Sequence, residues 1–205
     1  MKVTVDIEDD KLRTHIRECH QKAIELGACD TKAISTEAIS IEDQIVEMCK
    51  PPSCEGYGAS ANCPPHVMRP TEARVWIQGF HAAVVFKIDV APELLLSNER
   101  FDSFREVYMI SSGLEAFSQE RGYLLSRGLA AGSCRPVFCS NILCAALTDE
   151  GQCRYPSLAR PSMEALGINV FQLAKDLGWE IHPLLRDSDP KDAPTAMLAG
   201  LVLVS

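Results

Sequence analysis

The sequence lacks any run of about 18 apolar residues, the length at which a stretch becomes a candidate membrane-spanning helix. Basic charge is also scarce, since 20 lysines and arginines face 28 aspartates and glutamates, and the formal net charge is −8. Nucleic acids and anionic membranes bind basic faces, so we expect neither as a partner. The first residues, MKVTVDIEDD, are acidic where a secretory signal peptide is apolar, which predicts a cytoplasmic protein.

Two phosphate-binding signatures are missing as well. Neither G-x-G-x-x-G nor G-x-x-x-x-G-K-S/T occurs, so nucleotide binding has no support in the sequence. The 205 residues are 46% hydrophobic, which is enough for a core, and no low-complexity linker divides them. We therefore predict a single metal-binding domain over residues 1–205.

Cysteine, by contrast, is plentiful, and its spacing repeats along the chain. One group follows the pattern C-x4-C-x8-C, and a later group repeats this pattern with one further cysteine at an x4 spacing upstream. The first cassette consists of Cys49, Cys54 and Cys63, and the second of Cys134, Cys139, Cys144 and Cys153. Because such a repeat is hard to obtain by chance, these cysteines are the predicted metal ligands and cofactor-binding residues.

The clustering of the cysteines indicates a metal rather than disulfides. Cytoplasmic thiols stay reduced, and the odd total of nine cysteines does not suit a disulfide framework. Thiolates hold zinc or iron–sulfur clusters, and a C-x4-C step is known in iron–sulfur sites. Pro64 follows Cys63 directly, and Pro156 comes soon after Cys153, where proline fixes the chain as it leaves a cluster. We predict two clusters of the 4Fe–4S type, with structural zinc as the alternative.

The two cassettes differ in their number of thiols, and this difference bears on function. The second cassette can saturate a cluster, whereas the first has three thiols, and Gln44 stands where the repeat would place a fourth. Candidates for the missing ligand are Cys29, Cys19, His66 or an exogenous group.

Two centres in one small acidic domain favour electron transfer by an oxygen-sensitive protein, or electron delivery to a partner enzyme or metallocofactor. A redox partner protein is therefore expected. One alternative is an enzyme whose first cluster has an open iron that binds substrate. The other is an interaction module stabilised by zinc.

Both cassettes lie in segments that resemble one family. The first segment carries C-E-G-Y-G over residues 54–58 and C-P-P over 63–65, and the second carries C-R-Y-P over 153–156 and A-R-P-S-M-E-A-L-G-I-N-V over 159–170. These motifs resemble the predicted metal-binding proteins that contain domain of unknown function 2284, from about residue 40 to the C-terminus. The resemblance implies metal binding and does not specify an activity.

Charged residues accompany the second cassette. Arg135, Arg154 and Arg160 lie beside its cysteines in the sequence, and guanidinium groups near a cluster would offset its negative charge. The run Ser162–Glu164 is predicted to begin a short helix. Glu164 fits there either as a first-turn glutamate favoured by the helix dipole or as an acid or base near a cluster.

The hydrophobic patterning predicts an α+β fold, with a small mixed sheet, flanking helices and two cysteine-rich metal-binding loops. The longest helix, over residues 99–122, is expected to be interrupted near Ser111–Gly113. The predicted helices span residues 10–26 and 99–122, with a further helix opened by Asn169 and closed by Gly178 and one or two helical turns over 42–48. The main predicted strands span 81–90, 124–131, 179–185 and 198–204.

Overall fold

A four-stranded sheet in the order β1-β2-β4-β3 organises the computed structural model, which describes residues 9–140, 142–149, 151–184 and 188–205. The strands are β1 (Asp30–Ser35), β2 (Ala82–Val90), β3 (Arg127–Leu129) and β4 (Ala196–Val204). β2 and β4 are long and almost wholly buried because the sheet is covered on both faces, which explains why their sequences read as continuous apolar runs.

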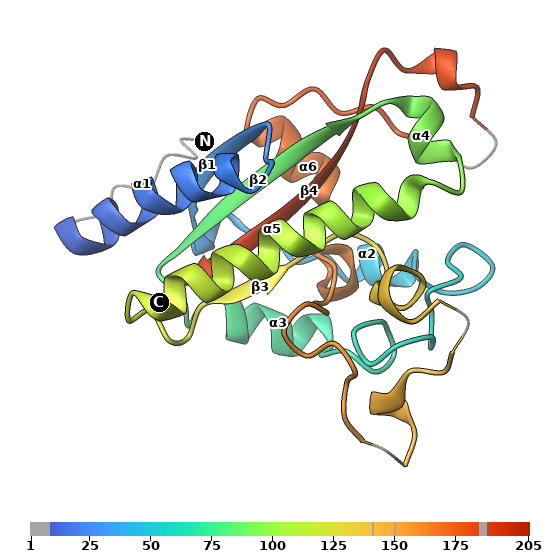
Figure 1. Ribbon diagram of the computed structural model, residues 1–205, viewed down its shortest axis with the longest axis horizontal. Helices are drawn as coiled ribbons and strands as arrows, with labels where there is room; N and C mark the ends of the chain where they lie inside the picture. Colours follow the sequence, from blue (N-terminus) through green and yellow to red (C-terminus); the bar gives the residue numbers. More distant parts are fainter. Residues whose placement is uncertain (1–8, 141, 150, 185–187) are drawn as a thin grey trace.

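Helices cover the two faces of this sheet (Figure 1). One face packs against α1 (Asp10–Glu25) and α5 (Arg100–Glu120), with Val84, Phe86 and Val202 contributing from the strands. The other face packs against α3 (Pro70–Ile77) and α6 (Val170–Asp176), with Val85 and Leu201 between them. Two further short helices are α2 (Asp43–Glu47) and α4 (Pro92–Leu96). None of the described helices is long and apolar enough to cross a membrane.

The predicted α+β class is confirmed. The four strands pair antiparallel, so the sheet is not mixed as predicted, and within the described residues parallel pairing is confined to an isolated bridge between Ala130 and Ser162. β1 and β4 run in one direction and β2 and β3 in the other, so each pair of neighbouring strands in the order β1-β2-β4-β3 is antiparallel.

The expected interruption of the longest helix is wrong, because α5 continues through Ser111–Gly113. The Ser112 hydroxyl donates to Tyr108 O at 2.8 Å and the Ser111 hydroxyl to Leu129 O at 3.1 Å, so both polar side chains are satisfied within a buried helix. At Gly113 a Cβ would lie 2.9 Å from Leu26 Cδ1, so glycine lets the end of α1 approach α5.

The strand predicted over residues 179–185 is also not formed within 179–184, and Leu185 lies outside the described residues. Trp179, at the start of this run, is buried, and its Nε1–H donates to Asp30 Oδ2 at 2.7 Å. The segment therefore packs by side-chain contacts after α6 and does not join the sheet.

Candidate metal centres

The two cysteine-rich segments come together on one side of the molecule. The first follows α2 and the second follows β3, and Figure 1 shows them, in cyan and in yellow to orange, gathered below α5. Both are largely irregular, apart from short turns that include a π-helical turn at Arg135–Cys139. Segments distant in the sequence thereby supply neighbouring side chains.

The first cassette surrounds one cavity of about 300 Å³. All three of its cysteines line this cavity, and so do Glu164 and Gly56. A Cβ at Gly56 would lie 3.3 Å from Cys54 Sγ and 3.6 Å from Cys63 Sγ, so the missing side chain leaves open space beside two sulfurs. The remaining lining residues are Tyr57, Pro64, Phe104, Ala131, Gly132, Ser133, Ser162, Ala165 and Leu198.

The second cassette surrounds a separate cavity of about 240 Å³. All four of its cysteines line this cavity, together with the aromatic rings of Phe138 and Tyr155. These rings stack with centroids 5.5 Å apart, and Phe138 also meets Tyr108 edge-on at 5.2 Å. The second cavity therefore has an aromatic wall that continues into the core.

One hydroxyl joins the two cassettes. The Ser60 hydroxyl is buried, and its Oγ lies 3.4 Å from Cys63 Sγ and 3.6 Å from Cys134 Sγ. Asn62 Nδ2 is 3.5 Å from Cys134 Sγ, and Ser133 Oγ is 3.3 Å from Cys63 Sγ. Each segment thus supplies polar contacts to a sulfur of the other cassette, and the two cavities share a wall.

The surroundings of Cys49, Cys134 and Cys139 favour the neutral thiol, because they raise the pKa of each. A hydrogen bond with the Cys54 thiol, together with burial, raises the pKa of Cys49 far above its ordinary value. Burial is the main cause that raises the pKa values of Cys134 and Cys139. Because thiolate is the metal-binding form, loading these sites releases protons, and a bound cation supplies the charge that stabilises the thiolates.

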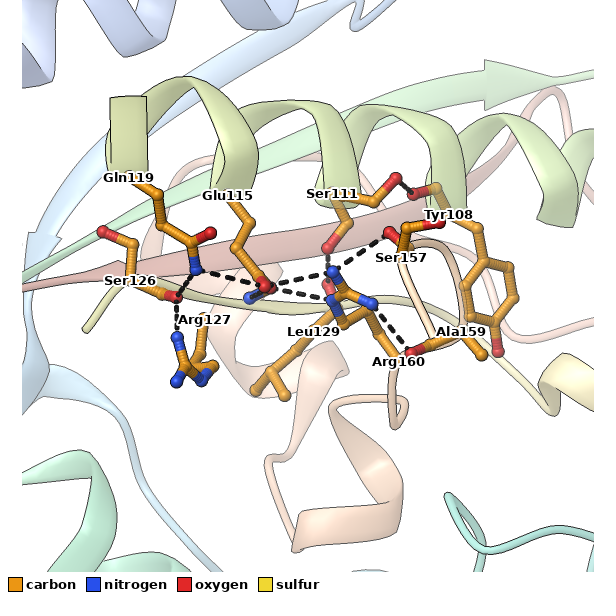
Figure 2. Close-up of polar contacts among 12 residues, drawn as sticks. Tyr108, Ser111, Glu115, Gln119, Ser126, Arg127, Leu129, Ser157, Ala159 and Arg160 are labelled. Atoms are coloured by element: carbon orange, nitrogen blue, oxygen red, sulfur yellow. Dashed lines mark hydrogen bonds and ion pairs between the residues drawn. The ribbon is translucent and has the colours of Figure 1, made fainter. Parts of the chain in front are cut away.

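A nearly buried ion pair supports the segment that carries the second cassette (Figure 2). Arg160 forms a bidentate ion pair with Glu115 of α5, in which Nε donates to Oε2 at 2.8 Å and Nη2 donates to Oε1 at 3.0 Å. The same guanidinium donates to the backbone carbonyls of Pro156, Ser157 and Ala159. The Arg160 guanidinium therefore attaches the backbone that follows Cys153 to α5.

The other two arginines predicted to accompany this cassette bind its backbone. Arg135 Nε donates to Ile142 O at 3.1 Å, and Arg154 Nη1 donates to Leu143 O at 2.7 Å. Their guanidinium groups thus shape the loop around Cys144, and Arg135 also lines the second cavity.

The three protein residues considered as a fourth ligand of the first cassette do not line its cavity. Cys19 is buried between α1 and α5, where its Sγ lies 3.3 Å from His15 Nε2. Cys29 is exposed beside the β1–β2 pair, where its Sγ accepts from Asp89 N at 3.4 Å. His66 is exposed next to the C-P-P turn.

The structure places Glu164 at the first cavity, although the sequence puts it closer to the second cassette. No spacing rule predicts this, because the segment around residue 164 reaches α2 only through the tertiary fold. The roles of Ser60, Asn62 and Ser133 were likewise missed, since serine and asparagine are ordinary loop residues.

The donor set in the two cavities fits a thiophilic metal centre. Across the described residues, no three His, Cys, Asp or Glu side chains converge as they would around a single metal ion. The thiols stand instead around cavities of hundreds of cubic ångströms, with room left beside Gly56.

Fold and site together define an α+β protein with two neighbouring thiol-lined cavities. The chain belongs to the family described as "Predicted metal-binding protein (DUF2284)", whose model matches residues 32–204. The resemblance noted in the sequence is thereby confirmed, and the family description supports metal binding without identifying the metal. Neither curated proteins nor solved structures yield a match to this chain.

Proposed function

We propose that the protein holds an iron–sulfur cluster of the 4Fe–4S type in each cavity and transfers electrons to a partner enzyme or metallocofactor. The observation that carries this proposal is the pairing of each cassette with its own cavity. A single zinc ion needs four ligands at about 2.0–2.3 Å from one point, whereas a cubane accepts thiolates from around a larger body.

The wall shared by the cavities supports electron transfer. Ser60 contacts a sulfur of each cassette, so two bound clusters would lie close together. Hydrogen bonds to cluster sulfurs and burial adjust reduction potential, and Ser60, Asn62 and Ser133 supply polar contacts of this kind. Bound clusters would supply one-electron chemistry, while the chain positions them and excludes water.

The loop of the second cassette is the proposed docking site for the redox partner. Ile142 and Leu143 are exposed on the loop that precedes Cys144, and Leu147 and Tyr155 are partly exposed nearby. A partner protein that docks on this loop would approach the second centre. We propose a protein as the partner, in the cytoplasm, with neither nucleic acid nor a membrane involved.

The test of the proposed function is anaerobic purification followed by measurement of iron, acid-labile sulfide and zinc. We expect a brown protein with iron and sulfide nearer two cubanes than one. Stoichiometric zinc without sulfide would instead favour the interaction module and overturn the electron-transfer proposal.

A second candidate function is catalysis at the first cavity. It is favoured by a further hollow of about 440 Å³ that shares Cys54 and Gly56 with the first cavity and is also lined by Arg100 and Arg135. An anionic substrate held by these arginines would lie beside the cassette with three thiols. In that case the iron without a cysteine ligand is open, and cyanide should change the spectrum of the wild-type protein.

A further inference from the structure

We propose that Glu164 is the fourth protein ligand of the first centre, so that this site is a three-cysteine, one-carboxylate site. The inference rests on the proposed function and deepens it. It assigns to one residue the position that the second candidate function leaves open.

The Glu164 side chain lies at the first cavity. Glu164 lines the same cavity as Cys49, Cys54 and Cys63, and it lies close enough to Cys49 and Cys54 for electrostatic interaction with their thiols. Carboxylate oxygen is an established protein ligand for transition metals, and it complements three thiolates where a fourth cysteine is missing.

One oxygen of the Glu164 carboxyl group is unsatisfied. The Glu164 carboxyl group forms hydrogen bonds with the Ser162 side chain and with its own backbone. Its Oε2 atom, however, is buried and has no hydrogen-bond partner among the described residues, although the residue as a whole keeps some exposed surface. A buried carboxylate oxygen without a partner is costly, and such an orphan requires an explanation. A metal bound in the cavity would satisfy this oxygen.

Backbone contacts hold the segment that carries Glu164 on both sides. On one side, Met163 N donates to Ala130 O at 3.1 Å, next to the bridge between Ala130 and Ser162. On the other side, Ile168 forms a bridge with Ile41, and Glu42 N donates to Gly167 O at 2.8 Å.

These contacts tie the turn Glu164–Leu166 to β3 and to the segment before α2. Because α2 leads directly into Cys49, the carboxylate and the first thiol are held in one framework. A ligand needs this kind of fixed placement, whereas a solvated glutamate does not.

The test compares Glu164→Gln, Glu164→Cys and the wild type by iron and sulfide content and by ⁵⁷Fe Mössbauer spectroscopy. In the wild type we expect a minority iron component with an oxygen ligand, visible as a higher isomer shift. Glu164→Gln should lose this component together with iron from the first site. Glu164→Cys should retain the iron but convert that component to the all-sulfur type, because thiolate replaces the carboxylate as a ligand.

The matched control is Glu55→Gln, which removes the same charge next to Cys54 from an exposed position outside the first cavity. We expect it to keep both the iron content and the oxygen-ligated component. Circular dichroism of each variant separates loss of metal from loss of fold, and rescue by cysteine would not occur if Glu164 were only structural.

The outcomes separate the two proposals. A wild type without iron and sulfide overturns the proposed function and the assignment of Glu164 together. Two intact clusters with no oxygen-ligated iron, or with a spectrum unchanged in Glu164→Gln, overturn the Glu164 assignment alone. Cyanide binding by the wild type equal to that of Glu164→Gln would also contradict it, because the iron would then already be open.

Discussion

Because Gly56 has no side chain, space inside the first cavity is left unfilled at this residue. A Cβ there would lie 3.2 Å from Ser133 Cβ and within 3.6 Å of two cassette sulfurs. We predict that Gly56→Ala lowers the iron and sulfide content of the first site, because the methyl group occupies space beside Cys54 and Cys63. The backbone at Gly56 is not in the left-handed region, so steric filling is the change that is tested.

Metal analysis and electron paramagnetic resonance of the reduced Gly56→Ala protein provide the measurement. The signal of the second site serves as the internal control and should keep its intensity. Full loading of both sites would mean that the space beside Gly56 is not where the metal centre lies.

The buried side chain of His15 makes the free energy of unfolding depend on pH. It is buried, stacks on Tyr123 with centroids 4.0 Å apart, and forms a hydrogen bond with Ser118 at 3.0 Å. Burial lowers the pKa of His15, although nearby Glu18 opposes this effect and Arg121 reinforces it. The unfolded chain therefore binds this proton at a higher pH than the folded chain.

We predict that the free energy of unfolding falls as pH is lowered below about 6.5, by at most about 1.4 kcal/mol per pH unit from this residue. Urea unfolding between neutral and mildly acidic pH measures the slope. In His15→Gln the contribution should disappear even if the overall stability is lower. An identical slope in both proteins would assign the effect to other groups.

Among the elements, those with strong patterns agree with the sequence prediction. α1 begins at its Asp9 cap, whose carboxylate accepts from Lys11 N and Leu12 N, and the chain turns at Gly27 with φ 114°. β2 and β4 were predictable because long apolar runs suit strands covered on both faces. The break expected in α5 failed because tertiary hydrogen bonds satisfy Ser111 and Ser112, and these bonds depend on neighbours that local propensity does not include.

The candidate site could be predicted from the sequence only in part. The repeated spacing separated the cysteines into two cassettes, and each cassette lines its own cavity. That Glu164 would join the first cavity and Ser60 would contact both could not be read from spacing, because the fold brings these residues there from other segments. The spacing of cysteines in the sequence identifies ligands that lie on one loop. The complete ligand set also depends on which loops the fold brings together.

The ion pair between Glu115 and Arg160 attaches the second cysteine segment to α5. Glu115 accepts from Gly128 N at 2.6 Å and binds Arg160, and both side chains of the pair are nearly buried. We predict that Glu115→Ala lowers the free energy of unfolding by about 3–5 kcal/mol, because it leaves the guanidinium without its partner.

Chemical denaturation of the metal-free protein measures this change and separates it from metal loss. Glu120→Gln, at the exposed end of the same helix, is the matched control and should change stability little. A small effect of Glu115→Ala would indicate that water replaces the carboxylate at Arg160.

For the molecule as a whole, the sheet and its helices form a frame, and the two cavities lie in loops attached to it. The first cavity takes residues from α5, from β4 and from both cysteine segments, so one bound centre contacts much of the frame. A metal that binds only the folded state adds stability through mass action, by about 4 kcal/mol at a thousandfold excess over its dissociation constant. Folding and loading of this chain are therefore expected to be coupled.

The wall at Ser60 would bring the two proposed clusters close enough to interact magnetically. Ser60 lies 3.4 Å from Cys63 Sγ and 3.6 Å from Cys134 Sγ, so clusters in the two cavities would be separated by little more than one side chain. We predict that the fully reduced protein gives a broadened electron paramagnetic resonance spectrum with spin–spin interaction between the centres. Partial reduction should instead give the narrower signal of a single reduced cluster.

The control for this experiment is Cys144→Ser, which removes a thiol of the second cassette other than Cys134, the one that contacts Ser60. We expect it to lose the second cluster and to give an uncoupled signal from the first one at every stage of reduction. A fully reduced wild-type spectrum equal to the sum of two independent signals would show that the clusters are too far apart to interact. The electron relay through the wall at Ser60 would then be excluded, even if both clusters were present.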